Sequence, residues 1–544
     1  MKKFTIFSII ATAAIFVVGG MYFDLFKQAP SQETEQTAPE QEKTESETST
    51  DDNKTNSGSF GVTVSEIAQN AAEPQEEPKE AKEAAELDQR TLFDKTRRGV
   101  VAIKVSVVLD KALYNKLWYG TGFVADREKG LIVTNAHVAG ELTVCSYEVK
   151  FGNGKKVEAK LEYLDPCYDF AILSVDPKEI PQYVIPLKIS NENLSINTEI
   201  YSMGNSANNE FSTYKGYVFD TESILWLKPI PEQSFQFSGL TVPGASGSPV
   251  LNTKGEVVGL LYGGKFVSGA ALPISYITPV IKTLQKGKNF HRYFCGFMIN
   301  YGSIQDFISV GSLPETALEE YEKAFPDSND KVLYITRKLS AYGADKLGLE
   351  SGDIIWKIDG ELIGPRLKRI DELVQAKEGK SISMTIYRNG KKQEVEVPTY
   401  ELSNMSKMRI LSFAGTVFYE TPPEYKICLG KSSTGVYVAD CESGSAFQEL
   451  CAPEQNPDVV SAGAQIISID GKDISTLEDI VNVIPSLYKK KSFNIRFIRL
   501  CGDSQVSSVI AKHNPDFAEA KLYSFDQSTK NWHVKVIPNA RHNG

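Results

Sequence analysis

One short stretch of the chain combines a serine with a high density of glycine and proline. Residues 241–250 read Thr-Val-Pro-Gly-Ala-Ser-Gly-Ser-Pro-Val. This composition predicts a tight turn, which can expose a hydroxyl and direct backbone N–H groups at one point. Acyl transfer needs a nucleophile beside such donors. We therefore predict that Ser246 is a nucleophile and that the N–H groups of Gly244, Ala245 and Ser246 form an oxyanion hole. Taken alone, the stretch also fits an ordinary surface loop.

A histidine lies at the end of an apolar run further upstream. Residues 131–138 read Leu-Ile-Val-Thr-Asn-Ala-His-Val, which predicts a strand followed by a loop at His137. His137 is the only histidine before residue 291, so it is the only local candidate for the base that activates a serine. The alternative for a single histidine is a structural role.

An aspartate completes the set of candidate groups. Asp169 directly precedes an apolar strand predicted at 170–175. A carboxylate at such a position can orient an imidazole and stabilise its protonated form. Asp165 is a nearby competitor, although its Asp-Pro dipeptide indicates a turn, and Asp169 itself could be a turn or cap residue. The chain order histidine, aspartate, serine is that of the chymotrypsin arrangement.

The elements that must position these residues are short β-rich runs separated by Gly, Asn and Asp. The runs lie at 100–108, 122–125, 131–133, 148–151 and 170–175. This spacing predicts an all-β sandwich or barrel.

At these positions the chain resembles the HtrA/Deg family of serine proteases. Four segments carry the resemblance, in the family's order: Gly-Thr-Gly-Phe at 120–123, Thr-Asn-Ala-His-Val at 134–138, Asp-Phe-Ala-Ile-Leu at 169–173 and Pro-Gly-Ala-Ser-Gly-Ser-Pro at 243–249. The family usually has Asn before the serine and Gly two residues after it, where this chain has Ala245 and Ser248. Ala245 can still donate its backbone N–H, and Ser248 adds a side chain where the family has none.

The resemblance implies a mainly β protein with a chymotrypsin-like double β-barrel over residues 90–288 and the site between the barrels. It implies a serine endopeptidase of protein quality control that cleaves unfolded or damaged exported proteins, with no metal or organic cofactor. It also implies a homotrimer. Leu240 lies where the family's primary pocket would be, so we expect an apolar side chain before the scissile bond.

A repeat follows the barrel region. Gly-Asp-Ile-Ile-Trp-Lys-Ile-Asp-Gly at 352–360 recurs as Gly-Ala-Gln-Ile-Ile-Ser-Ile-Asp-Gly at 463–471, each with a helix-like stretch and a strand after it. Self-similarity of this kind predicts two copies of one module.

The repeated module resembles a PDZ domain, and we place the copies at 289–401 and 402–512. PDZ domains bind the C-terminus of a peptide as an added strand, and loop N–H groups hold its carboxylate. Phe294, Cys295, Gly296 and Phe297 resemble that loop in the first copy. Residues 413–416 are the candidate counterpart in the second copy, where a glycine turn without a ligand is the alternative.

The two ends of the chain differ in composition from its body. Two lysines precede an apolar run at 4–23, which predicts a signal sequence or membrane anchor over 1–27. Residues 28–89 are predicted to form a disordered acidic linker. Because positive residues stay on the cytoplasmic side of a membrane, we expect an exported, periplasmic protein that is anchored to the inner membrane or soluble after signal cleavage. Residues 513–544 receive no function, although a hairpin between 521–523 and 533–537 is expected.

Charge and cysteine content narrow the functional classes. Residues 31–90 carry 16 acidic against 5 basic side chains, which leaves the chain from residue 91 nearly neutral and gives no basis for nucleic-acid binding. The seven cysteines form no CxxC pair, so no zinc site is predicted. Two functions remain: a serine endopeptidase, and a proteolytically inactive PDZ scaffold or chaperone.

Overall fold

The computed structural model describes residues 90–539, except for 108–116, 141–143, 207–208, 226–231, 240, 266, 327, 329, 340–346, 403–408, 421–434, 442–444, 447–463, 499–505 and 517–518. The chain divides into two units, 1–86 and 87–544, and every described residue belongs to the second. The predicted anchor and linker therefore lie outside the described residues. Within the described part of the chain, no helix is both long enough and apolar enough to cross a membrane.

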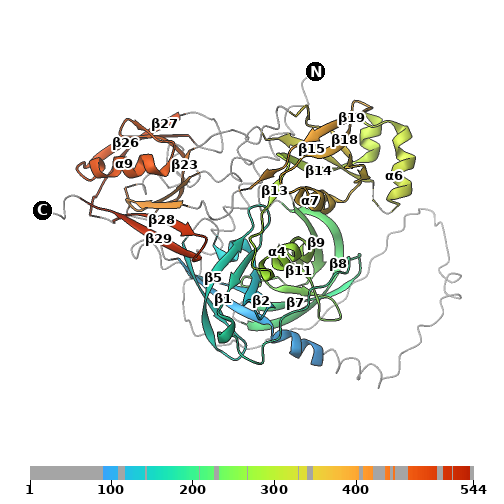
Figure 1. The fold of residues 1–544 in the computed structure, drawn as a ribbon, viewed down its shortest axis with the longest axis horizontal. Coiled ribbons are helices and arrows are strands. Elements are labelled where there is room, and N and C mark those ends of the chain that lie inside the picture. The colour runs from blue at the N-terminus through green and yellow to red at the C-terminus, as the bar shows by residue number, and fades with distance from the viewer. Residues whose placement is uncertain are drawn as a thin grey trace, which may run out of the picture. The chain divides into compact units, whose positions relative to one another are not determined.

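Two closed barrels of six strands each form the first part of the described chain (Figure 1). The first barrel closes in the order β1-β2-β3-β6-β5-β4 and the second in the order β10-β11-β12-β9-β8-β7. The strands of the first barrel are β1 (Val100–Val107), β2 (Leu117–Asp126), β3 (Leu131–Thr134), β4 (Cys145–Lys150), β5 (Lys156–Leu164) and β6 (Ala171–Ser174). Those of the second are β7 (Glu199–Ser206), β8 (Asn209–Leu225), β9 (Glu232–Ser238), β10 (Pro249–Leu251), β11 (Val257–Lys265) and β12 (Ser268–Pro273).

Apolar and polar side chains alternate along the strands, so the apolar ones fill the interior of each barrel. In β5 the side chains of Val157, Ala159 and Leu161 are buried, while Glu158 and Lys160 between them are exposed. This period of two is what a half-buried strand requires. The expectation of a mainly β, chymotrypsin-like double barrel is confirmed.

A smaller module follows helix α4 (Thr278–Gln285). Its strands β14 (Phe297–Ser303), β15 (Lys331–Lys338), β16 (Ile354–Ile358), β18 (Ile382–Arg388) and β19 (Lys391–Val397) form a sheet in that order, with β17 (Glu361–Leu362) beside β16. Helix α7 (Leu367–Ala376) packs its apolar side chains into the same core. Two short helices between β14 and β15, α5 (Ile304–Ser309) and α6 (Leu318–Ala324), were not predicted from the sequence.

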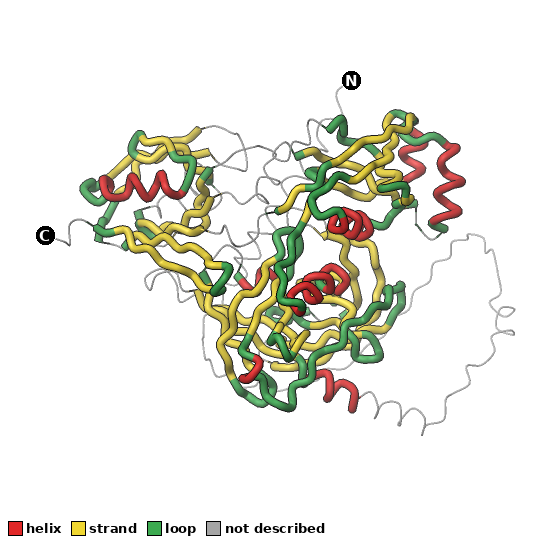
Figure 2. Tube along the Cα trace, in the orientation of Figure 1, coloured by secondary structure: helices red, strands yellow, loops and turns green. Residues whose placement is uncertain are grey.

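A second module repeats this pattern and enlarges it (Figure 2). Its sheet runs β27-β26-β24-β23-β22-β21-β28-β29, with β25 (Lys472–Asp473) beside β24. The strands are β21 (Arg409–Phe413), β22 (Thr416–Glu420), β23 (Val436–Cys441), β24 (Gln465–Ile469), β26 (Ser492–Ile498), β27 (Val506–Lys512), β28 (Ala520–Asp526) and β29 (Asn531–Ile537). Helix α9 (Leu477–Leu487) begins at a capping box of Thr476 and Asp479.

The repeated Asp-Gly turns occupy equivalent places in the two modules. Asp359 and Gly360 connect β16 to β17 with φ angles of 50° and 83°, and Asp470 and Gly471 connect β24 to β25 with 53° and 73°. Two successive positive φ angles define the tight hairpin turn that Asp-Gly favours. The expected hairpin at the end of the chain is also confirmed, because β28 pairs with β29.

Candidate active site

His137 lies on the one-turn helix α3 (Ala136–Ala139), which follows β3 directly. Gly140 ends the helix in the left-handed region, with φ of 78°. The side chain of His137 is 40% exposed, so one face of the imidazole stays accessible to a substrate.

Two aromatic residues hold this short helix in place. Nε1 of Trp118 donates a hydrogen bond to the carbonyl oxygen of Val138 at 2.9 Å. The hydroxyl of Tyr147 donates to the carbonyl oxygen of Ala139 at 2.8 Å. The last carbonyls of a helix have no partner within it, so these two bonds fix its C-terminal end. Sequence reasoning missed both residues, because they are distant in the chain and belong to no motif.

Asp169 binds His137 through both of its carboxylate oxygens. Oδ2 lies 2.7 Å from Nδ1 of the imidazole, and Oδ1 accepts the backbone N–H of His137 at 3.0 Å. The side chain of Asp169 is 3% exposed. In addition, Nδ2 of Asn135 donates to the carbonyl oxygen of Asp169 at 2.8 Å. This arrangement holds the ring so that its Nε2 faces away from the carboxylate.

Asp165, the alternative candidate for the partner of His137, has a structural role instead. It is fully buried and accepts the backbone N–H groups of Cys167 and Tyr168 at 2.8 and 2.9 Å, together with the hydroxyl of Tyr163 at 2.8 Å. It therefore shapes the turn that leads into Asp169. The structure separates the two carboxylates, one as the partner of His137 and one as the organiser of the turn.

Ser246 lies in a loop between β9 and β10. Its hydroxyl donates to the carbonyl oxygen of Tyr262 at 3.4 Å. Within the described part of the chain, no hydrogen bond joins Ser246 to His137. Catalytic hydrogen bonds are often long in the absence of substrate, so this geometry is compatible with Ser246 as the candidate nucleophile.

The N–H groups of the same loop fall into two kinds. The N–H of Ala245 donates to the carbonyl oxygen of Val242 at 3.1 Å, so it points into the loop and does not serve an oxyanion. This corrects its expected place in the oxyanion hole. Among the described residues, no acceptor is found for the N–H groups of Gly244 and Ser246. Gly244 has φ of 93°, which a residue with a side chain rarely adopts.

The two departures from the family pattern are accommodated by packing. The methyl group of Ala245 is buried in the core of the second barrel. The hydroxyl of Ser248 donates to the carbonyl oxygen of Ala245 at 2.5 Å. Space for this side chain exists because Gly204 lies opposite, where an added Cβ would come within 1.8 Å of the Ser248 hydroxyl.

The carboxylate-binding loop expected at residues 294–297 lines an apolar pocket. Gly296 has φ of 80°, which lets the chain turn between β13 (Tyr293–Phe294) and β14. The first module contributes Tyr293, Phe294, Cys295, Phe297, Ile299, Leu367, Ile370, Asp371 and Val374 to the pocket, and the barrels contribute Cys167, Tyr168 and Tyr276. The loop that precedes Asp169 therefore faces the groove between β14 and α7.

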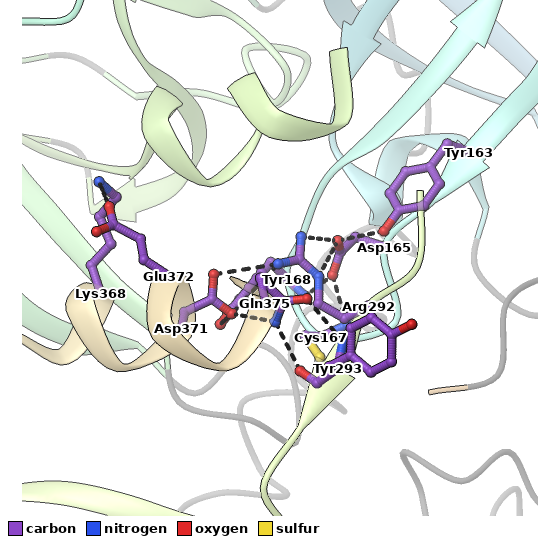
Figure 3. Close-up of polar contacts among 10 residues, drawn as sticks. All are labelled: Tyr163, Asp165, Cys167, Tyr168, Arg292, Tyr293, Lys368, Asp371, Glu372 and Gln375. Carbon is purple, nitrogen blue, oxygen red and sulfur yellow. Dashed lines mark hydrogen bonds and ion pairs between the residues drawn. The ribbon is translucent and has the colours of Figure 1, made fainter. Parts of the chain in front are cut away.

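A buried arginine joins these two regions (Figure 3). Arg292 is 3% exposed and contacts Oδ2 of Asp165 through Nε at 3.0 Å and Nη2 at 2.5 Å. Its Nη1 lies 3.4 Å from Oδ2 of Asp371 on α7. Burial raises the pKa of the Asp371 carboxyl, while Arg292 acts in the opposite direction. Tyr168 adds a hydrogen bond from its hydroxyl to Asp371 at 2.9 Å.

Two family models match the chain. The trypsin-like peptidase domain matches residues 120–260, which include His137, Asp169 and Ser246. The PDZ domain matches residues 327–399, which belong to the first of the two modules.

Curated relatives come from fungi. The pro-apoptotic serine protease NMA111 of Chaetomium globosum is 30% identical over 416 residues, covering 72% of this chain and 38% of that protein. NMA111 of Pyricularia oryzae is 29% identical over 389 residues, covering 68% and 35%. The chain thus spans well under half the length of these relatives. Among solved structures, the HtrA-type protease AlgW with a decapeptide has a TM-score of 0.44 and 18% identity, covering 58% of this chain and 99% of that one.

The fold and the matches define a trypsin-like peptidase domain joined to a PDZ domain. The expected combination of a trypsin-like serine protease domain and a PDZ domain, on which the resemblance rested, is confirmed. The predicted localisation is wrong, however. The relatives are fungal proteins, and a fungal cell lacks the space between two bacterial membranes that a periplasmic protein occupies.

Proposed function

We propose that this chain is a serine endopeptidase that cleaves unfolded or damaged polypeptides. The observation that carries the proposal is the two-point contact of Asp169 with His137, through the ring nitrogen at 2.7 Å and the backbone N–H at 3.0 Å. A carboxylate bound in this way fixes one ring orientation and one tautomer, which a general base for a serine requires. A histidine with only a structural role would not need a 40% exposed ring.

In the proposed reaction, Ser246 leaves its contact with the Tyr262 carbonyl and turns toward Nε2 of His137. The imidazole takes the hydroxyl proton while Oγ attacks the peptide carbonyl. The N–H groups of Gly244 and Ser246 stabilise the oxyanion, because neither has another acceptor among the described residues. His137 then gives the proton to the leaving amine, and water hydrolyses the acyl-enzyme by the same steps.

The first PDZ module would capture peptide C-termini. The groove between β14 and α7 is lined mainly by apolar side chains, and the Phe294–Phe297 turn lies at its end. A C-terminal residue with an apolar side chain fits this chemistry, with its carboxylate on the N–H groups of the turn. The homotrimer and the preference for an apolar residue before the scissile bond remain predictions from the family resemblance, and Leu240 lies outside the described residues.

The test compares the full-length chain with its Ser246→Ala variant on unfolded casein. We expect fragments from the wild type and none from the variant. Ser195→Ala is the matched control, because Ser195 is an exposed serine in the turn before β7, and it should cleave like the wild type. Equal cleavage by wild type and Ser246→Ala would rule out Ser246 as the nucleophile.

A proteolytically inactive scaffold or chaperone is the second candidate. It is favoured by one observation, the missing hydrogen bond between Ser246 and His137 among the described contacts. A wild type that prevents aggregation of casein yet produces no fragments, with and without added C-terminal peptides, would support it.

A further inference from the structure

The two modules differ in the pairing of one strand edge, the outer edge of β14 in the first module and of its equivalent β22 in the second. In the first module β14 follows the Phe294–Phe297 turn, and among the described strands it pairs only with β15. Strand β13, on the other side of that turn, pairs with β20 (Tyr400–Glu401) instead. The outer edge of β14 is therefore available to an added strand. In the second module β22 is the equivalent of β14, and its outer edge is paired with β21.

Strand β21 runs in the direction that a bound peptide would take. A peptide whose carboxylate lies at the start of β14 must extend back along that strand in antiparallel orientation. In the second module β21 is antiparallel to β22, and its last residue, Phe413, pairs with the first residue of β22, Thr416. Ala414 and Gly415 connect them with φ angles of 50° and 75°. These values define a two-residue hairpin turn where the first module has an open loop.

The side chains of β21 fill the place of a ligand's side chains. Leu411 and Phe413 are almost fully buried and belong to the same core as the apolar face of α9. The Phe413 ring lies 6.1 Å from that of Tyr488 and 6.4 Å from that of Phe493, measured between centroids. Residues two apart on a strand point to one face, as alternate side chains of a bound peptide do. An ion pair of 2.9 Å between Arg409 and Glu478 attaches the start of β21 to α9.

The other edge of β21 is also occupied. Strand β28 pairs with it from Arg409↔Ser524 to Ser412↔Lys521, and β29 continues the sheet. This C-terminal hairpin contacts the first barrel: Tyr523 belongs to the same buried apolar cluster as Val144, and Nζ of Lys530 lies 3.3 Å from Oε1 of Glu162. The ring of Trp532 packs against the core of that barrel.

We infer that the second module cannot bind peptide C-termini, because β21 permanently occupies the edge of β22 at which a peptide would add. The contacts of the C-terminal hairpin instead stabilise the first barrel. Recognition of C-terminal peptides then belongs to the first module alone. The inference rests on the proposed peptide-binding role of the PDZ modules, and it is independent of Ser246 chemistry.

A disulfide between β21 and β22 tests whether peptide binding requires β21 to separate from the edge of β22. Ser412 and Val417 are directly opposite, a position where Cα atoms of antiparallel strands come within disulfide range. The Ser412 hydroxyl has no partner among the described residues, so Ser412→Cys removes no hydrogen bond. The probe is a decapeptide ending in Val with a free carboxylate, and its C-terminal amide is the control.

We expect one peptide per chain, with affinity that changes less than about twofold between the oxidised and reduced Ser412→Cys/Val417→Cys variant. Ile299→Arg, which places a long cation in the groove of the first module, should abolish binding. Two peptides per chain, residual binding in Ile299→Arg, or loss of binding on oxidation would overturn the inference.

Amide hydrogen exchange supplies a readout that needs no ligand. Residues 410–413 should be protected as strongly as the centre of β26, within about tenfold. Trp532→Ala should accelerate exchange in β5 without changing that of β12. Exchange of 410–413 at the rate of an open loop would show that the edge is free, and unchanged exchange in β5 would contradict the stabilising role.

Discussion

The hydroxyl of Thr121 donates a hydrogen bond of 2.9 Å to the carbonyl oxygen of Gly244 and so joins the first barrel to the loop of Ser246. The backbone N–H of Thr121 donates to the carbonyl oxygen of Ser246 at 2.8 Å. The same hydroxyl accepts the N–H of Asn205 at 2.9 Å. Since His137 belongs to the first barrel and Ser246 to the second, the hydrogen bonds of Thr121 connect the two barrels next to the candidate catalytic residues.

Thr121→Val should slow casein cleavage and lower stability. Valine keeps the shape but removes the hydroxyl, which leaves the buried Asn205 N–H without its acceptor at a cost of about 1–3 kcal/mol. The measurements are the cleavage rate and the urea unfolding midpoint. Thr121→Ser, which retains the hydroxyl, should recover most of the rate. A valine variant with wild-type rate would show that this contact does not align the barrels.

Asp169→Asn should reduce the cleavage rate by about 10⁴-fold, because an amide in place of the carboxylate favours the wrong imidazole tautomer. Its stability should change little, since the neutral side chain can still accept the backbone N–H of His137. Initial rates on casein and a thermal melt measure the two effects. Comparable rates for Asp169→Asn and the wild type would contradict the proposed role.

Arg292→Met should destabilise the chain by about 3–5 kcal/mol, because it leaves the buried carboxylate of Asp165 without its counter-ion. Urea denaturation of the full chain measures this. Adding Asp165→Asn to Arg292→Met should recover part of the loss, since the unpaired charge is then gone. Lys254→Ala is a matched control at an exposed ion pair and should leave the urea unfolding midpoint almost unchanged.

Gly247→Ala should abolish cleavage. The residue has φ of 87°, and an added Cβ would lie 1.9 Å from the carbonyl oxygen of Thr121. Backbone cannot move aside as a flexible side chain does, so the serine loop would separate from the first barrel. Circular dichroism should still show β-structure. An active alanine variant would mean that the loop docks in another way.

Burial raises the pKa of the Cys145 thiol from 9.0 to about 12. In the unfolded chain this thiol ionises near 9.0, whereas in the folded chain it stays protonated up to about 12. Its contribution to the free energy of unfolding is therefore fully present below pH 9 and is lost as the pH rises from 9 toward 12. Urea midpoints at pH 8 and 10 should fall more for the wild type than for Cys145→Ala, and equal falls would contradict the raised pKa.

Local signals along the chain predicted much of this protein. Helix α9 is the helix-like stretch expected after the second copy of the repeat, and both Asp-Gly turns lie where the repeat indicated. Such features depend on residues within one or two turns of each other, so the sequence carries them directly. The order of His137, Asp169 and Ser246 was visible for the same reason, because each lies within a short motif.

Helices α5 and α6 lie between β14 and β15, outside the repeated segments, so the comparison of the two copies gave no signal for them. The choice between Asp165 and Asp169 could not be made from sequence either. Both flank one turn, and only closure of the barrel brings one of them to His137 and the other to Arg292, 127 residues away.

The sequence by itself determined the candidate catalytic side chains, the β-rich elements and the repeat, since these follow from residue type and short-range pattern. Only the tertiary structure decided which N–H groups remain for an oxyanion, which strand edge is open, and what holds the two barrels in register. Each of these depends on hydrogen bonds between segments distant in the chain, such as Thr121 with Gly244 and β21 with β28. Every residue except proline carries the same backbone N–H group, so residue type does not specify its acceptor, and the fold decides which acceptor it reaches.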